Sequence, residues 1–85
     1  MEEKRDVDRM MNERDIDGLI AALQDADEFA RSDAALALGA IGDQKALGPL
    51  DRMRSSDPSA SAREAAEIAY RWVVGRMEEV QKASR

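Results

Sequence analysis

Three carboxylate pairs come nearest to a chemical site in this 85-residue chain: Asp15 with Asp17, Asp25 with Asp27, and Glu78 with Glu79. Paired carboxylates ligate divalent cations or act as general acid and general base. No third ligand accompanies any pair, and residues two apart on a helix do not face each other. The chain also has no histidine and no cysteine, so it lacks the commonest general base and the thiolate metal ligand. We therefore expect no catalytic residue, no metal and no cofactor.

The net charge of −5 is unevenly distributed along the chain. Residues 1–43 carry 12 acidic and 5 basic side chains, whereas residues 44–85 carry 6 acidic and 8 basic ones. Nucleic-acid-binding domains concentrate positive charge on one face, so we expect no nucleic-acid partner. The longest apolar run is far shorter than the roughly 18 residues that a membrane span needs, so we expect no membrane association and a cytoplasmic protein.

The spacing of apolar residues predicts an all-α fold. Alanine is abundant, and no segment alternates apolar and polar residues with period two. Ile16, Leu19, Ile20 and Leu23 have the i, i+3, i+4, i+7 spacing of one helix face. Such stripes, preceded by aspartates placed as N-caps, predict helices at residues 3–12, 16–24, 28–41 and 44–54, and from about residue 59 onward.

Weak helix formers interrupt the most apolar part of the chain, residues 36–50. Gly42 follows the last apolar residue of the third helix, where a left-handed conformation favours glycine. Asp43 is then placed to cap the next helix. Gly39 has no cap to make, so we expect it to let two helices approach closely. Pro49 must kink the fourth helix or delay its regular start.

The chain contains an internal repeat. Residues 25–38 align with residues 57–70 at an offset of 32, and the helices before them align at an offset of 30. The matching positions include Asp25/Asp57, Ala30/Ala62, Arg31/Arg63, Ala34/Ala66 and Ala37/Ala69. The alignment predicts two helical hairpins in tandem. Because one hairpin of this size cannot bury its own apolar face, the hairpins must stack side by side.

The stretch from Arg31 to Asp43, RSDAALALGAIGD, is the most diagnostic part of the repeat. With the Asp57-Pro58 turn and the alanine-rich helix after it, this stretch resembles HEAT repeats, specifically the short HEAT-like repeats named after phycobilisome lyases. The resemblance covers about residues 15–74. It implies a short right-handed α-solenoid of about two helical hairpins with terminal capping helices.

The same resemblance implies a polar ladder between successive repeats. The ladder consists of the aspartate before each second helix and the arginine six residues on, namely Asp25, Arg31, Asp57 and Arg63. We favour a structural role for the two arginines, with carboxylates and turn carbonyls as their partners. In the alternative, they contact an anion or a peptide carboxylate of a partner.

The resemblance and the helix pattern divide the chain into four parts. They are an N-terminal capping helix at residues 1–14, a first repeat at 15–42, a second repeat at 43–74 and a C-terminal helical extension at 75–85. The second repeat has Arg71 and Val74 where the first has Gly39 and Gly42, so we expect no further repeat to stack after the last helix.

Ile68 and Trp72 are the candidate interface residues. They occupy the positions of Leu36 and Ala40, which we assign to the side on which another repeat would stack. In one interpretation the extension after Gly75 folds back and covers them with Met77 and Val80. In the other they form an exposed apolar patch for self-association or for a partner.

These features favour a non-enzymatic protein-binding or scaffold module, because solenoids bind through extended surfaces built by repetition. Deoxyhypusine hydroxylases, an enzyme family with HEAT-like repeats, bind iron through His-Glu motifs, and the lack of histidine excludes that activity here. We expect a protein partner or a homodimer formed through the C-terminal end. The alternatives are an accessory or chaperone-like subunit of a lyase-type cofactor-attachment system, or a structural repeat unit that self-associates.

Overall fold

The computed structural model describes residues 3–83 of the chain, and the side chains of residues 7–79. Residues 3–83 form five α-helices and one short 3-10 helix, with no strand in that span. The elements are α1 (Glu3–Asn12), α2 (Ile16–Ala22), α3 (Glu28–Ile41), η1 (Gln44–Ala46), α4 (Leu47–Ser56) and α5 (Ala60–Ala83). The predicted all-α fold class is confirmed, and the bounds of α1 and α3 agree with those predicted.

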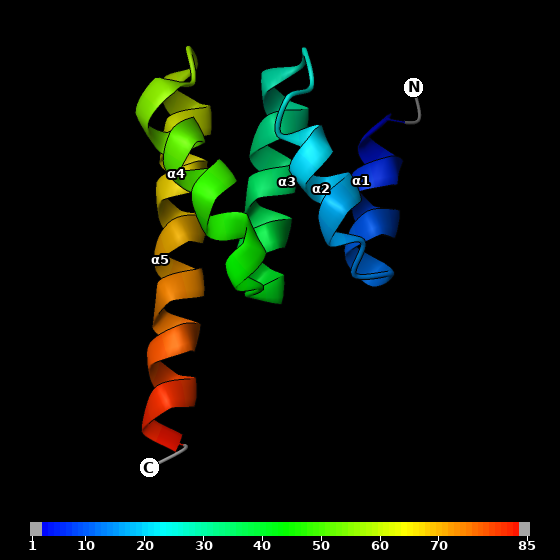
Figure 1. Cartoon of the computed structure of the whole chain (residues 1–85). Helices are drawn as coiled ribbons and strands as arrows, with labels where there is room; N and C mark the ends of the chain where they lie inside the picture. Colours follow the sequence, from blue (N-terminus) through cyan, green and yellow to red (C-terminus); the bar gives the residue numbers. More distant parts are fainter. Residues whose placement is uncertain (1–2, 84–85) are drawn as a thin grey trace.

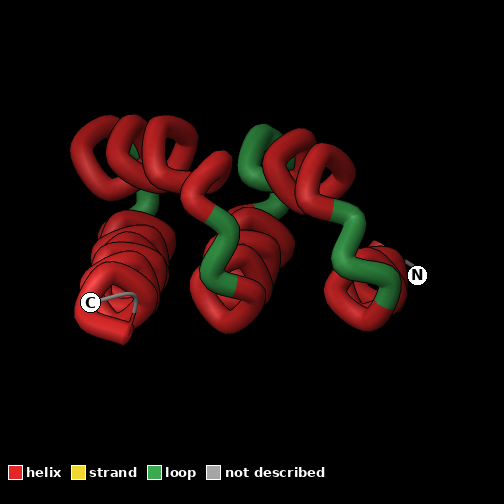
Figure 2. Tube along the Cα trace, turned by 60° about the horizontal axis from the view of Figure 1, so that its bottom comes forward, coloured by secondary structure: helices red, strands yellow, loops and turns green. Residues whose placement is uncertain are grey.

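The helices form two layers, which Figure 1 shows from the side of α2 and α4. Helices α1, α3 and α5 lie side by side in one layer, and α2 and α4 form a second layer that covers one side of it (Figure 2). Two hairpins, α2–α3 and α4–α5, thus stack next to each other, with α1 packed against the first of them. This arrangement is a short α-solenoid.

Local capping determines where most helices begin. The carboxylate of Asp15 accepts a hydrogen bond from the Gly18 amide at 3.0 Å, and that of Asp27 accepts one from the Phe29 amide at 3.0 Å. The Asp43 carboxylate accepts one from the Lys45 amide at 2.8 Å. Gly42 ends α3 with φ of +79°, the left-handed conformation that glycine adopts without a steric penalty. These predicted caps are confirmed.

The fourth helical segment begins irregularly, as Pro49 requires. Residues Gln44–Ala46 form the 3-10 turn η1, and the regular helix α4 starts only at Leu47. Pro49 then lies in the first turn of α4, where its missing amide hydrogen costs no intrahelical hydrogen bond. Of the two predicted effects of this proline, the structure shows the delayed start.

The core is built from small side chains around a few large ones. Leu19, Leu38, Leu50 and Val73 are the largest fully buried side chains of the described residues, and each stabilises the fold by about 1.5–3 kcal/mol. Helices α3 and α5 meet through alanines and Gly39. A Cβ atom at position 39 would lie 2.8 Å from the Ala69 Cα and 2.8 Å from the Trp72 ring. Gly39 therefore permits the close approach of two helices, as predicted.

The C-terminal extension does not fold back. Helix α5 continues without a break through Gly75 to Ala83 (Figure 1). A single glycine inside a helix costs only about 1 kcal/mol, and no proline follows it, so helix formation continues past this position. The interpretation in which residues after Gly75 return to cover Trp72 is therefore wrong.

Candidate functional site

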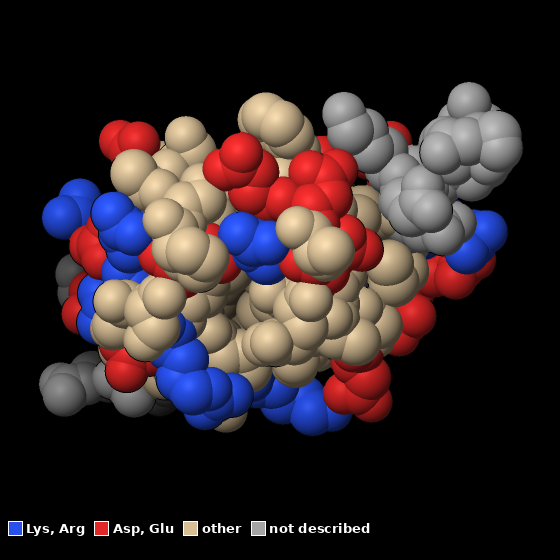
Figure 3. All heavy atoms as spheres, turned by 90° about the horizontal axis from the view of Figure 1, so that it is seen from above, with Lys and Arg blue, Asp and Glu red and all other residues tan. Residues whose placement is uncertain are grey.

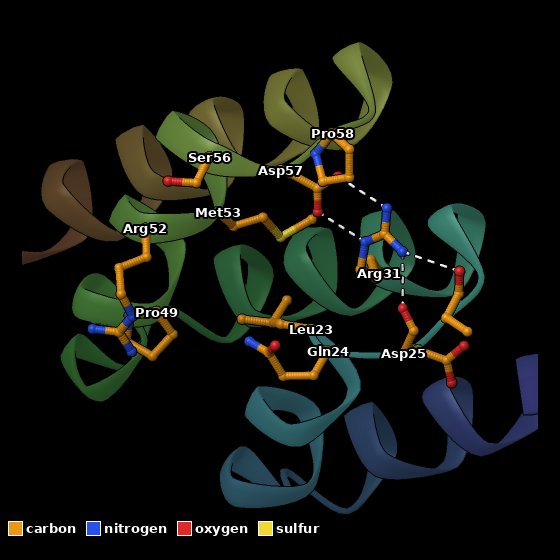
Figure 4. Close-up of a pocket in the computed structure, with 11 residues that line it drawn as sticks. Leu23, Gln24, Asp25, Arg31, Pro49, Arg52, Met53, Ser56, Asp57 and Pro58 are labelled. Carbon is orange, nitrogen blue, oxygen red and sulfur yellow. Dashed lines mark hydrogen bonds and ion pairs between the residues drawn. The ribbon is translucent and has the colours of Figure 1, made fainter.

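Arg31 joins the two hairpins. Asp57 lies in the turn before α5, and Arg31 lies in the first turn of α3, 26 residues earlier. Arg31 Nε donates to Asp57 Oδ2 at 2.8 Å, and Nη2 donates to Oδ1 at 2.9 Å. Nη1 donates to the carbonyls of Asp25 and Ala26 at 2.9 and 3.2 Å (Figure 4). The guanidinium thus binds its own turn and the next turn simultaneously.

The Arg31–Asp57 pair is largely buried. The side chains are only 13% and 6% exposed, and Asp57 Oδ1 also accepts a hydrogen bond from the Ser59 amide at 2.9 Å. These hydrogen bonds, above all those from Arg31, lower the pKa of the Asp57 carboxyl below its usual value. Four of the five N–H groups of the Arg31 guanidinium already have acceptors within the chain, which leaves little capacity for an external anion.

Arg63 repeats only half of this arrangement. Its Nη1 donates to the Asp57 carbonyl at 2.7 Å, which corresponds to the bond between Arg31 and the Asp25 carbonyl. Among the described residues, Arg63 meets no carboxylate. At the other end of the ladder, the Asp25 carboxylate accepts from the Asp27 amide at 2.8 Å. The structure thus brings Asp25, Arg31 and Asp57 together, whereas Arg63 contacts only the main chain of the turn.

A cleft separates α2 from α4 next to this ladder. It has a volume of about 530 Å³ and is lined by Leu23, Pro49, Arg52, Met53 and the Arg31–Asp57 pair, among others (Figure 4). Figure 3 looks down on the end of the molecule where the turns lie, and acidic and basic atoms alternate around the hollow there. The cleft is broadly open, and Arg31 in its wall already donates four hydrogen bonds within the chain.

The outward side of the layer formed by α1, α3 and α5 differs from the cleft in its side chains. We call it the three-helix face and define it by eight exposed residues of α1, α3 and α5: Asp8, Met11, Phe29, Asp33, Glu64, Ile68, Trp72 and Glu79. Four of these residues are large and apolar, with Trp72 51% and Phe29 61% exposed. They are all the exposed large hydrophobic side chains among residues 7–79. Exposed apolar side chains on one face make it a candidate interaction surface.

Trp72 lies in a groove between α3 and α5. The groove has a volume of about 390 Å³ and is also lined by Gly39, Ala40, Arg71 and Arg76. The indole packs over Gly39, so it points toward the preceding helix α3. We expected Trp72 on the side where another repeat would stack, whereas the structure places its ring against Gly39 of the preceding helix α3.

Of the other candidate interface residues whose side chains are described, Ile68 shares the face of Trp72 and Met77 does not. Met77 is partly buried against the core. It lies five residues after Trp72, which places it about 140° around a straight helix. Val80 belongs to α5, but its side chain lies outside the described part of the chain. Ile68 and Trp72 share a face, and Met77 does not belong to it.

Two kinds of site are missing from the described residues. Within them, no three histidine, cysteine, aspartate or glutamate side chains come close enough to hold a metal ion. The helices described are also too short or too polar to cross a membrane.

The architecture agrees with the comparisons to known proteins. Residues 7–71 match the family model for HEAT repeats, so the chain belongs to the HEAT repeat family. Over an alignment of 47 positions that covers 52% of the chain, it is 47% identical to the deoxyhypusine hydroxylase of Eremothecium gossypii. The chain spans 15% of the length of that relative. No solved structure matches the chain.

Three residues with visible roles escaped the sequence analysis. Met11 and Phe29 belong to the three-helix face, and Phe29 could have been noticed as an aromatic residue outside the apolar stripe of its helix. Arg54 stacks on the Tyr70 ring at 3.8 Å and binds Glu67 Oε1 at 2.9 Å, which ties α4 to α5. No sequence motif signals this contact, because it depends on how the second hairpin closes.

Proposed function

We propose that this chain is a non-enzymatic protein-binding module that holds its partner on the three-helix face. The observation that carries the proposal is the gathering of Met11, Phe29, Ile68 and Trp72 on that face. Tryptophan and other large side chains supply much of the binding energy in protein interfaces. HEAT repeats commonly mediate interactions between proteins, in line with this role.

The likeness to a deoxyhypusine hydroxylase supports the repeat architecture more than the activity. The aligned region is short, and these 85 residues contain no histidine to bind the iron expected for that chemistry. The finer alternative, an accessory subunit of a phycobilisome-lyase type system, rests on the repeat motif. Copurification of a tetrapyrrole with the chain would support this alternative over the general binding module.

Affinity copurification with a matched pair of variants tests the proposal. The wild-type chain, the double variant Phe29→Ser/Trp72→Ser and the cleft variant Arg52→Ser are used as baits in extracts of the native source. We expect the same proteins to be retained by the wild type and by Arg52→Ser and lost by the double variant, with unchanged helical circular dichroism. Proteins that are lost with Arg52→Ser but kept by the double variant would contradict it.

Self-association through the same face is a second candidate, favoured by the half-exposed indole of Trp72. A homodimer would cover this apolar surface with its own copy. A stable interface buries about 800 Å² per partner, a substantial share of the 5475 Å² surface of this chain. Sedimentation at increasing protein concentration tests this candidate, and a constant monomer mass up to millimolar concentration contradicts it.

A further inference from the structure

We infer that the partner segment recognised by the three-helix face is an amphipathic helix whose polar side carries lysine or arginine. This inference rests on the proposed function and adds the chemistry of the partner to it. It follows from the charge of the face, the shape of its grooves and the kinds of backbone contact that an all-helical surface offers.

The exposed charges of the three-helix face are acidic. Asp8 and Asp33 flank the groove between α1 and α3, and Glu64 and Glu79 lie on the α5 stripe that carries Ile68 and Trp72. Four carboxylates therefore surround four apolar side chains. Complementary charges steer a partner and exclude partners of like charge. The net charge of −5 for the chain adds to this preference for a basic partner.

Two arginines, Arg71 and Arg76, also border the Trp72 groove, so the excess of carboxylates lies toward α1 and the N-terminal half of α5. Arg71 Nε donates to Glu67 Oε2 at 2.9 Å, and Glu67 also accepts a hydrogen bond from Arg54. Arg76 lies beyond the end of α3, with its side chain against Gly42.

The partner must satisfy its own backbone hydrogen bonds, because the described part of this face offers no free backbone donor or acceptor to an extended peptide. The described chain has no sheet edge, so an extended peptide cannot add to it as a strand. The backbone groups of α3 and α5 are already used within their helices. A helix bonds its own backbone, and its side-chain ridges fit the grooves between neighbouring helices. The two grooves, beside Leu36 and beside Trp72, are the places for apolar anchors.

Trp72, the sole tryptophan of the chain, provides the readout. The probes are three synthetic helical peptides without tryptophan. The first has leucine on one face and lysine on the other. The second replaces lysine by glutamate, and the third has the composition of the first with its leucines spread around the helix. Each peptide is titrated into the wild-type chain while the emission of Trp72 is recorded.

We expect the leucine–lysine peptide to shift the emission to shorter wavelength in a saturable way. The leucine–glutamate peptide should bind at least about tenfold more weakly, and the difference should shrink at high salt because screening weakens surface charges. The variant Asp33→Lys/Glu64→Lys should reverse the preference. The variant Asp51→Lys changes a carboxylate of α4, away from the face, and should leave the preference unchanged.

Two outcomes would overturn the inference, and they have different consequences. If the lysine and glutamate peptides bind with equal affinity and Phe29→Ser weakens both, the charge preference is wrong while the binding face stands. If the peptide with dispersed leucines binds as well as the amphipathic one, recognition of a helix face is wrong. If the copurification experiment also retains proteins on the Phe29→Ser/Trp72→Ser variant, the proposed function fails with it.

Discussion

Arg31 and Asp57 are 26 residues apart in the chain, yet their side chains form a bidentate ion pair with N–O distances of 2.8 and 2.9 Å. The pair connects the first turn of α3 to the turn before α5, so it joins the two hairpins at the end where their turns lie. An arginine fork matches a carboxylate in geometry as well as in charge. Its loss should therefore disturb the stacking of the hairpins, in addition to removing a local contact.

Replacing Asp57 by alanine should lower the melting temperature by roughly 10 °C. A loss of 1 kcal/mol corresponds to about 4–8 °C in a domain of this size, and removing Asp57 leaves the largely buried guanidinium without its carboxylate partner. Asp51→Ala is the matched control, because Asp51 pairs with Arg54 on the same helix and is 55% exposed. Thermal unfolding followed by circular dichroism measures both, and equal melting temperatures for the two variants would contradict a special role for Asp57.

Asp57 should also make the stability of the chain sensitive to acid. Its pKa in the folded state is lowered, mainly by the hydrogen bonds from Arg31. A depressed carboxyl pKa contributes stability above the pKa of the unfolded chain, about 3.9, and this contribution is lost as the pH falls through the lower folded value. The free energies of unfolding of wild type and Asp57→Asn should therefore differ at pH 7 and converge as the pH falls below the lowered pKa of Asp57. Urea unfolding across this range tests it, and a difference that stays constant would count against the ion pair.

Two glycines should respond oppositely to alanine. A Cβ at Gly39 would lie 2.8 Å from the Ala69 Cα, a backbone atom, so we expect Gly39→Ala to destabilise the chain by about 1–2 kcal/mol despite its better helix propensity. A Cβ at Gly75 meets nothing within 4 Å, so Gly75→Ala should stabilise it by about 0.5–1 kcal/mol. Denaturant unfolding measures both. Stabilisation by both substitutions would show that α3 and α5 lie farther apart than described.

Local signals predicted the helix boundaries well. Asp27 caps α3 and Gly42 ends it, and each does so through contacts within a few residues, which a sequence pattern can reveal. The role of Gly39 followed from the absence of any local use for a glycine at that position. The internal repeat predicted two hairpins in tandem, and the all-helical HEAT architecture follows from it.

Features that depend on packing direction could not be predicted in the same way. The repeat alignment places Trp72 opposite Ala40, but it does not tell which side of α5 meets α3. Similarly, one interpretation has the chain fold back after Gly75, yet this glycine, unlike Gly42, lies inside a continuous helix. The difference is physical: Gly42 has a positive φ, and Gly75 does not. The four carboxylates of the three-helix face come from three helices, so only the fold places them on one side of the molecule.

The straight course of α5 makes a last prediction about Trp72. Its indole is 51% exposed, so its fluorescence should be quenched by acrylamide in the native chain at low protein concentration. Residue 80 lies eight residues further along α5, about 12 Å along a straight helix axis. Val80→Ser should therefore leave the emission and the quenching unchanged. If the extension folded back instead, this substitution would uncover the ring and increase quenching, and that result would contradict the continuous helix. Quenching that weakens with rising protein concentration would instead show a second copy covering the three-helix face.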